Sequence, residues 1–117
     1  MKLIDRHGPC VGLRLFKSKT RFIQLWFCPE YYVIEQHSHP DEHIELMYLF
    51  GSTTFYRLGG HIEWFTPKWY DMFKTFSVKP GVVHWFNVTN QPLVFINWSK
   101  FNPGKTPVSA AVDFKEI

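Results

Sequence analysis

Cysteine and long apolar runs are both scarce in this sequence, and each shortage excludes a class of protein. The two cysteines, Cys10 and Cys28, are too few for a disulfide framework, so we expect both to be free thiols. No apolar run approaches the length needed to cross a bilayer, and the first residues lack the apolar segment of a signal peptide. We therefore expect a cytoplasmic protein that does not act at a membrane.

Charge of one sign is not concentrated anywhere in the chain. The 13 Lys and Arg residues are scattered, and the formal net charge is only +3. The one close group, Lys17, Lys19 and Arg21, does not lie in a nucleic-acid-binding motif. A mildly basic surface is therefore favoured over a nucleic-acid groove.

Sustained helical periodicity is missing as well, whereas aromatic residues are abundant at 19% of the chain. Aromatic and β-branched runs between Gly, Pro and Asn turns indicate about nine short strands, as in a sandwich or barrel. After an irregular lead-in at 1–10, the expected strands are 11–16, 21–28, 31–39, 44–50, 53–58, 61–65, 72–78, 82–89 and 93–99, with a further edge strand at 108–114. At 117 residues, the sequence predicts one all-β domain with little or no helix.

Four of the six histidines form a pattern that indicates a metal site. His37 and His39 are two residues apart, so on an extended chain they point to the same side. Pro40 favours a turn that would bring His43 towards them, and His84 lies on a remote hairpin. Neutral imidazole suits a divalent transition metal such as Mn, Fe, Co, Ni, Cu or Zn. We therefore predict a metal site made by these four residues inside a β-barrel.

The fourth ligand has alternatives. Glu45 shares the alternation of His43 along a strand, so either side chain can complete the site, and Glu42 would reach inward if the turn differed. Otherwise both glutamates would be exposed or would support a ligand ring. No general base can be named from the sequence. Further side chains are expected to line a pocket: Arg57, Phe86, Gln24, Phe55 and Trp64.

The first histidine segment, at about 35–51, resembles the first motif of the cupin superfamily, G-x5-H-x-H-x3,4-E-x6-G. His37 and His39 match its H-x-H, and His43 stands where the shorter spacing places Glu. Gly51 lies one residue beyond the closing glycine, and Tyr31 replaces the first one. The pattern is similar to that of small single-domain bacterial cupins with a four-histidine, manganese-type site.

The second segment, at about 78–88, resembles the second cupin motif, G-x5-P-x-G-x2-H-x3-N. Pro80, Gly81 and His84 match its proline, glycine and histidine, and Asn87 lies one residue early. The resemblance implies a cupin-type jelly-roll β-barrel, or double-stranded β-helix, of antiparallel strands. It makes 1–117 a single cupin domain with 101–117 as a C-terminal tail.

The resemblance also implies what such a protein would bind and do. A divalent metal, Mn or Fe first, would be held with open coordination positions for a small-molecule ligand or substrate. The resulting hypothesis is a metal-dependent dioxygenase or isomerase that acts on a small organic molecule. The alternatives are a non-catalytic cupin that binds a sugar or metabolite, and a structural cupin whose histidines only pack. A homodimer is the expected assembly.

Overall fold

The structure is a computed structural model that describes residues 3–102, so the expected edge strand at 108–114 lies outside the described residues. Ten strands lie in this range: β1 (Ile4–His7), β2 (Cys10–Lys17), β3 (Arg21–Cys28), β4 (Val33–His37), β5 (Glu42–Phe50), β6 (Thr53–Gly59), β7 (His61–Phe65), β8 (Thr75–Val78), β9 (His84–Val88) and β10 (Leu93–Phe101). A single short 3-10 turn, η1 (Trp69–Asp71), is the only helical element among the described residues. The prediction of an all-β chain with little helix is confirmed.

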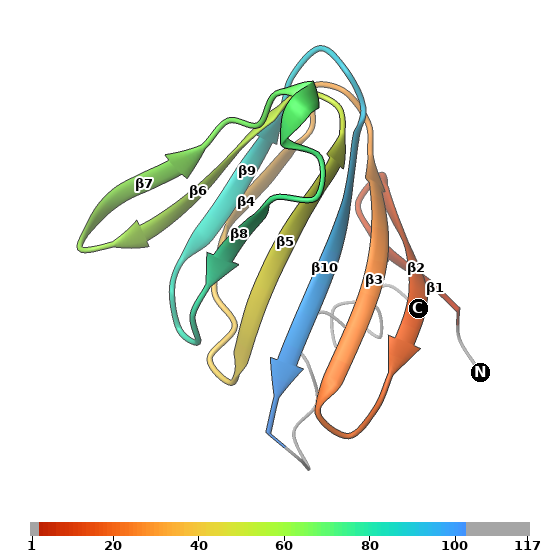
Figure 1. Ribbon diagram of the computed structural model, residues 1–117, viewed down its shortest axis with the longest axis vertical. Coiled ribbons are helices and arrows are strands. Elements are labelled where there is room, and N and C mark those ends of the chain that lie inside the picture. Colours follow the sequence, from red (N-terminus) through yellow and green to blue (C-terminus); the bar gives the residue numbers. More distant parts are fainter. Residues whose placement is uncertain (1–2, 103–117) are drawn as a thin grey trace.

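The strands form two antiparallel sheets (Figure 1). One sheet has six strands in the order β1-β2-β3-β10-β5-β8, and the other has four in the order β4-β9-β6-β7. Both sheets contain strands from distant parts of the chain. In the six-stranded sheet, for example, β10 lies between β3 and β5. Figure 1 shows β6 and β7 projecting to one side as a hairpin.

The core lies between the two sheets. Burial alternates residue by residue along β3, β5 and β10, because neighbouring side chains of a strand point to opposite faces. Phe55 and Phe86 from the four-stranded sheet pack against Phe95 from the six-stranded sheet, with ring centroids 5.3–6.1 Å apart. These edge-to-face contacts account for part of the aromatic content and join the two sheets.

The first strand was not predicted, because residues 1–10 were expected to be irregular. In β1 the apolar Ile4 is exposed and the charged Asp5 is fully buried, which inverts the usual pattern of an amphipathic strand. Asp5 accepts hydrogen bonds from Arg14 Nε at 2.9 Å and from Gln24 Nε2 at 2.6 Å. A buried polar network therefore holds this edge strand, and hydrophobic alternation gives no sign of it.

Two connections at the same end of the molecule bring the histidine segments together. The β4–β5 connection contains His39, and the β8–β9 connection contains Gly81. The backbone N–H of Gly81 donates to the carbonyl of His39 at 3.0 Å. This bond fixes the two connections to each other at the lower end of the molecule in Figure 1. Within residues 3–102, no helix has the length and hydropathy to span a bilayer.

Candidate metal centre

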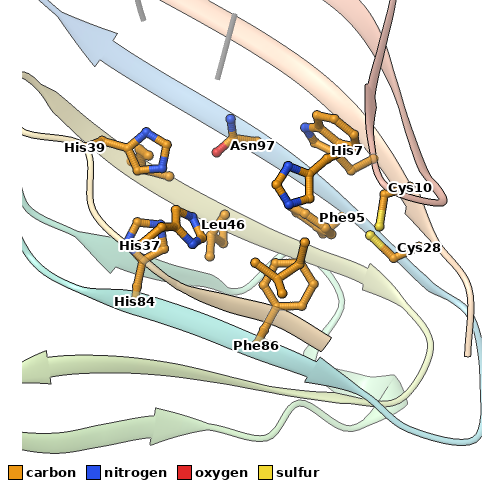
Figure 2. A pocket seen from close by; sticks show the side chains of 13 residues that line it. His7, Cys10, Cys28, His37, His39, Leu46, His84, Phe86, Phe95 and Asn97 are labelled. Carbon is orange, nitrogen blue, oxygen red and sulfur yellow. The ribbon is translucent and has the colours of Figure 1, made fainter. Parts of the chain in front are cut away.

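Three of the four predicted histidines meet in space. His37 at the end of β4 pairs directly with His84 at the start of β9. His39 follows in the β4–β5 connection and turns towards the same side (Figure 2). One possible ligand atom from each of the three lies within 4.8 Å of those of the other two. Among the described residues, this is the one group of three such side chains that could hold a metal ion.

The hydrogen bonds of His37 and His84 fix which ring nitrogen is available. Nδ1 of His37 lies 2.7 Å from the carbonyl oxygen of Glu35, and Nδ1 of His84 lies 3.1 Å from that of Val82. A carbonyl oxygen only accepts, so each Nδ1 carries the proton and donates. Nε2 of each ring therefore keeps its lone pair for a ligand. This pattern is usual for histidines that bind a metal.

His39 has a carboxylate beside it instead of a carbonyl. Its Nδ1 lies 3.5 Å from Oε1 of Glu42, and both side chains are buried. A carboxylate next to Nδ1 favours the proton on that nitrogen and leaves Nε2 as the basic atom. The three rings thus offer three neutral nitrogen donors, which fit a divalent transition metal.

Burial keeps the rings of His84 and His37 uncharged. Desolvation, helped by the nearby His37, lowers the pKa of His84 from 6.5 to about 3. Desolvation is also the largest cause of the lowered pKa of His37. It outweighs the hydrogen bond to the Glu35 carbonyl, which by itself would raise that pKa. Imidazole binds a metal only in its neutral form, so these two rings do not need to lose a proton at neutral pH.

The structure does not bring His43 or Glu45 to this group. Both lie on the outer face of the six-stranded sheet, where Nε2 of His43 is 2.9 Å from Oε1 of Glu45. Ser77 on the neighbouring β8 donates to the same carboxylate. The reason is the alternation of β5, which turns Glu42 and Ile44 inward and His43 outward.

A cavity of about 170 Å³ extends from the three histidines between the sheets (Figure 2). Most of its lining is apolar, and its polar members are histidines and one amide. The lining residues are His7, Cys10, Trp26, Cys28, Ile34, His37, His39, Ile44, Leu46, His84, Phe86, Phe95 and Asn97. Both cysteines are free and buried, as expected from the sequence.

Of the five expected pocket residues, Phe86 lines the cavity. Phe55 is fully buried behind it and contacts Phe86 and Phe95 in the core. Gln24 is buried in the polar network, where its Oε1 accepts hydrogen bonds from Trp26 Nε1 and Asn97 Nδ2. Gln24 therefore supports two side chains that line the cavity but does not line it itself.

The other two residues, Arg57 and Trp64, do not line the cavity. Arg57 pairs with Glu63 through Nε at 3.1 Å, donates to the carbonyl of Ser77 and stacks on the ring of Phe76. Trp64 is 66% exposed on β7, because the β6–β7 hairpin projects from the body of the molecule. Arg57 is the cross-strand neighbour of His84, but its guanidinium is engaged by Glu63 and the Ser77 carbonyl.

Sequence reasoning missed His7 and Asn97 as lining residues. His7 was assigned to an irregular lead-in, and its strand is not recognisable from hydrophobic alternation. The sequence does contain a signal for the role of Asn97, because it is a polar residue two positions from Phe95 on the inward face of β10. An amide at a core-facing position of an apolar strand indicates either a buried network or a ligand contact.

No protein-family model matches the sequence, and no curated protein matches it. Solved structures do match. A Klebsiella pneumoniae protein with a double-stranded β-helix domain is 16% identical, with a TM-score of 0.66 over 87% of this chain and 86% of that one. KdgF from Halomonas sp. is 10% identical, with a TM-score of 0.69 over 84% and 85% of the two chains.

A third match is oxalate decarboxylase of Bacillus subtilis, which has Mn(II) centres. It is 22% identical, with a TM-score of 0.71 over 92% of this chain but only 30% of that one. The cupin domain of Cnp3 from Schizosaccharomyces pombe also matches, with a TM-score of 0.69 at 12% identity over 82% of this chain and 67% of that one. This chain therefore has the double-stranded β-helix fold of the cupins, and its three-histidine cluster fits a metal site.

Proposed function

We propose that this protein is a metal-dependent dioxygenase that binds iron or manganese through His37, His39 and His84. The observation that carries the proposal is the group of three clustered imidazoles, those of His39 and His84 buried, that opens onto an apolar cavity. A bound divalent ion would supply a Lewis acid that keeps its full charge among neutral ligands and has open positions for a small organic molecule and dioxygen.

The protein's own residues hold the ligand rings in place and exclude water from the substrate. Carbonyl oxygens fix the rings of His37 and His84, and the carboxylate of Glu42 lies 3.5 Å from Nδ1 of His39. The apolar walls keep water from the substrate, and dioxygen partitions readily into apolar surroundings. An isomerase would need a positioned acid or base at the substrate, and the lining residues outside the cluster with such side chains are His7, Cys10 and Cys28. Oxygen chemistry needs no such group on the protein, so we place it before isomerisation.

The metal content of protein purified without added metal tests the first half of the proposal. We expect about one transition-metal ion per chain, and a large loss in His84→Ala or His37→Ala. His43→Ala is the matched control, because this residue lies on the outer face, and it should keep the metal. Wild-type protein that holds no metal after reconstitution with Fe(II) or Mn(II) would contradict the proposal.

Oxygen uptake tests the second half. The iron-loaded protein is mixed with pools of small organic molecules in an oxygen-electrode cell, and products are analysed by mass spectrometry. Uptake of dioxygen with incorporation into a product supports a dioxygenase. Formation of an isomer without oxygen uptake, or retention of an unchanged molecule, would replace the dioxygenase with an isomerase or a binding protein.

A further inference from the structure

We infer that the molecule bound at this site has a compact apolar body, about the size of one ring, and a single metal-chelating head. This excludes sugars and small dicarboxylates as ligands. The inference rests on the proposed metal centre and adds the substrate class. It follows from the composition, size and layout of the cavity.

The composition of the lining argues against polar ligands. None of the lining residues within 3–102 is Arg, Lys, Asp or Glu. The second carboxylate of a dicarboxylate would be buried without a cation, which is strongly unfavourable. A sugar would bury several hydroxyl groups against Ile44, Leu46 and Phe95, where they would lack hydrogen-bond partners.

The size of the cavity sets the size of the ligand body. Its volume is about 170 Å³. An apolar cavity of about 150 Å³ lined by Leu, Ile and Phe stays dry and accepts benzene. A benzene ring or a branched alkyl group of similar volume therefore fits here.

The layout of the cavity sets the orientation of the bound ligand. Figure 2 shows the three clustered histidines on one side of the cavity and Phe86, Phe95 and the two cysteines on the other. A chelating head at the histidines would place the apolar body against these aromatic rings. Asn97 and His7 are the remaining polar side chains along the wall, so a hydroxyl or amide group on the body can be satisfied only beside these two residues.

Two hydroxamates with the same chelating head test the inference. Acetohydroxamate has a methyl group where benzohydroxamate has a phenyl ring. Isothermal titration of each into zinc-loaded protein gives two dissociation constants, and titration of free zinc gives the intrinsic difference between the heads. We expect benzohydroxamate to bind at least about tenfold more tightly after that correction, as a matched apolar pocket allows.

A variant that fills the cavity tests whether the preference for the phenyl ring arises there. Leu46→Phe should abolish the preference for the phenyl ring, because Leu46 lines the cavity. Met47→Phe is the matched control, since the next residue of β5 points to the other face. The wild-type comparison does not depend on either variant folding.

The possible failures are distinguishable. Equal affinity for the two hydroxamates, or tighter binding of oxalate or glucose, would overturn the inference and leave the metal centre standing. Metal-loaded protein that binds neither hydroxamate would also overturn it. Protein that takes up no zinc, iron or manganese would instead remove the proposed function on which the inference rests.

Discussion

At the scale of single residues, His84 connects burial with stability. It is 3% exposed, and burial lowers its pKa from 6.5 to about 3. In the unfolded chain it titrates near 6.5, so at lower pH the unfolded state binds the proton that the folded state rejects. The stability of the metal-free protein should therefore fall as pH drops from about 6.5 towards 3, with no contribution from His84 above that window.

Urea unfolding of metal-free protein between about pH 4 and pH 7 measures this fall, which one such proton can make as steep as about 1.4 kcal/mol per pH unit. His84→Gln should make the profile flatter, because the amide does not titrate. His61→Gln, at an exposed position, should leave the profile as it is. Parallel profiles for wild type and His84→Gln would contradict the expected role of burial.

Glu42 and Glu45 form a natural pair for a second test. Glu42 is buried beside Nδ1 of His39, whereas Glu45 faces out and pairs with His43. Loss of a carboxylate that orients a ligand histidine usually lowers metal affinity by about 10–100-fold. Glu42→Gln should therefore weaken metal binding in a competition titration, and Glu45→Gln should not. Equal effects would show that Glu42 has no orienting role.

These residues also show how far the sequence predicts the site. His37, His39 and His84 were found from spacing and turn signals, and the structure brings them together. His43 was grouped with them because the turn at Pro40 was expected to carry it inward. The expected strand began at Ile44, whereas β5 begins at Glu42 and its alternation places His43 on the outer face.

At the scale of elements, the third prediction concerns two glycines in the turns between strands, Gly51 and Gly60. Gly51 has a φ of +105° in the β5–β6 turn, and a Cβ there would overlap the carbonyl oxygen of Pro92. Gly60 has a φ of +83° in the β6–β7 turn, with open space around the Cβ position. Gly60→Ala should cost about 1–2 kcal/mol for its backbone conformation alone.

Gly51→Ala bears the same conformational cost and must also displace backbone, which should add about 1–3 kcal/mol to the loss of stability. Thermal unfolding of the two variants measures the difference. An equal shift in melting temperature would mean that the β5–β6 turn and Pro92 move apart without cost. The glycine signals predicted both turns, but the close approach of Pro92 depends on tertiary packing that local sequence does not encode.

Strand β1 also shows that local sequence cannot predict contacts between distant residues. Its stability comes from Asp5, Arg14 and Gln24, which are 9 to 19 residues apart in sequence. A pattern read within one short segment cannot identify such partners, so the segment was expected to be irregular. The predicted strands whose apolar residues alternate, such as β3, match the structure in their bounds.

At the scale of the whole molecule, the aromatic core holds the two sheets together. Phe55 is fully buried and contacts rings from both sheets. Phe55→Ala should lower the free energy of unfolding by about 3–5 kcal/mol, because it removes buried surface and leaves a cavity. Trp64→Ala, at an exposed aromatic of comparable size, should change it by no more than about 0.5 kcal/mol.

Denaturant titration of both variants measures these changes. A small effect at Phe55 would mean that the sheets close over the missing ring. The general architecture was predictable because turn residues and alternating strands recur along the whole chain. The choice between Phe55 and Phe86 as the lining residue was not, because both face inward and only the packing between sheets decides which one reaches the cavity.

Gly12 and Trp26 give the cavity a built-in optical probe. A Cβ at Gly12 would lie 2.7 Å from the indole of Trp26, so the ring rests directly on the bare backbone of β2. All five tryptophans lie in the described part of the chain, and Trp26 is the only buried one. Buried indole emits at shorter wavelength than exposed indole, so filling or wetting of the cavity should alter the blue edge of the emission and leave the red edge unchanged. Fluorescence can therefore follow occupancy in unlabelled protein.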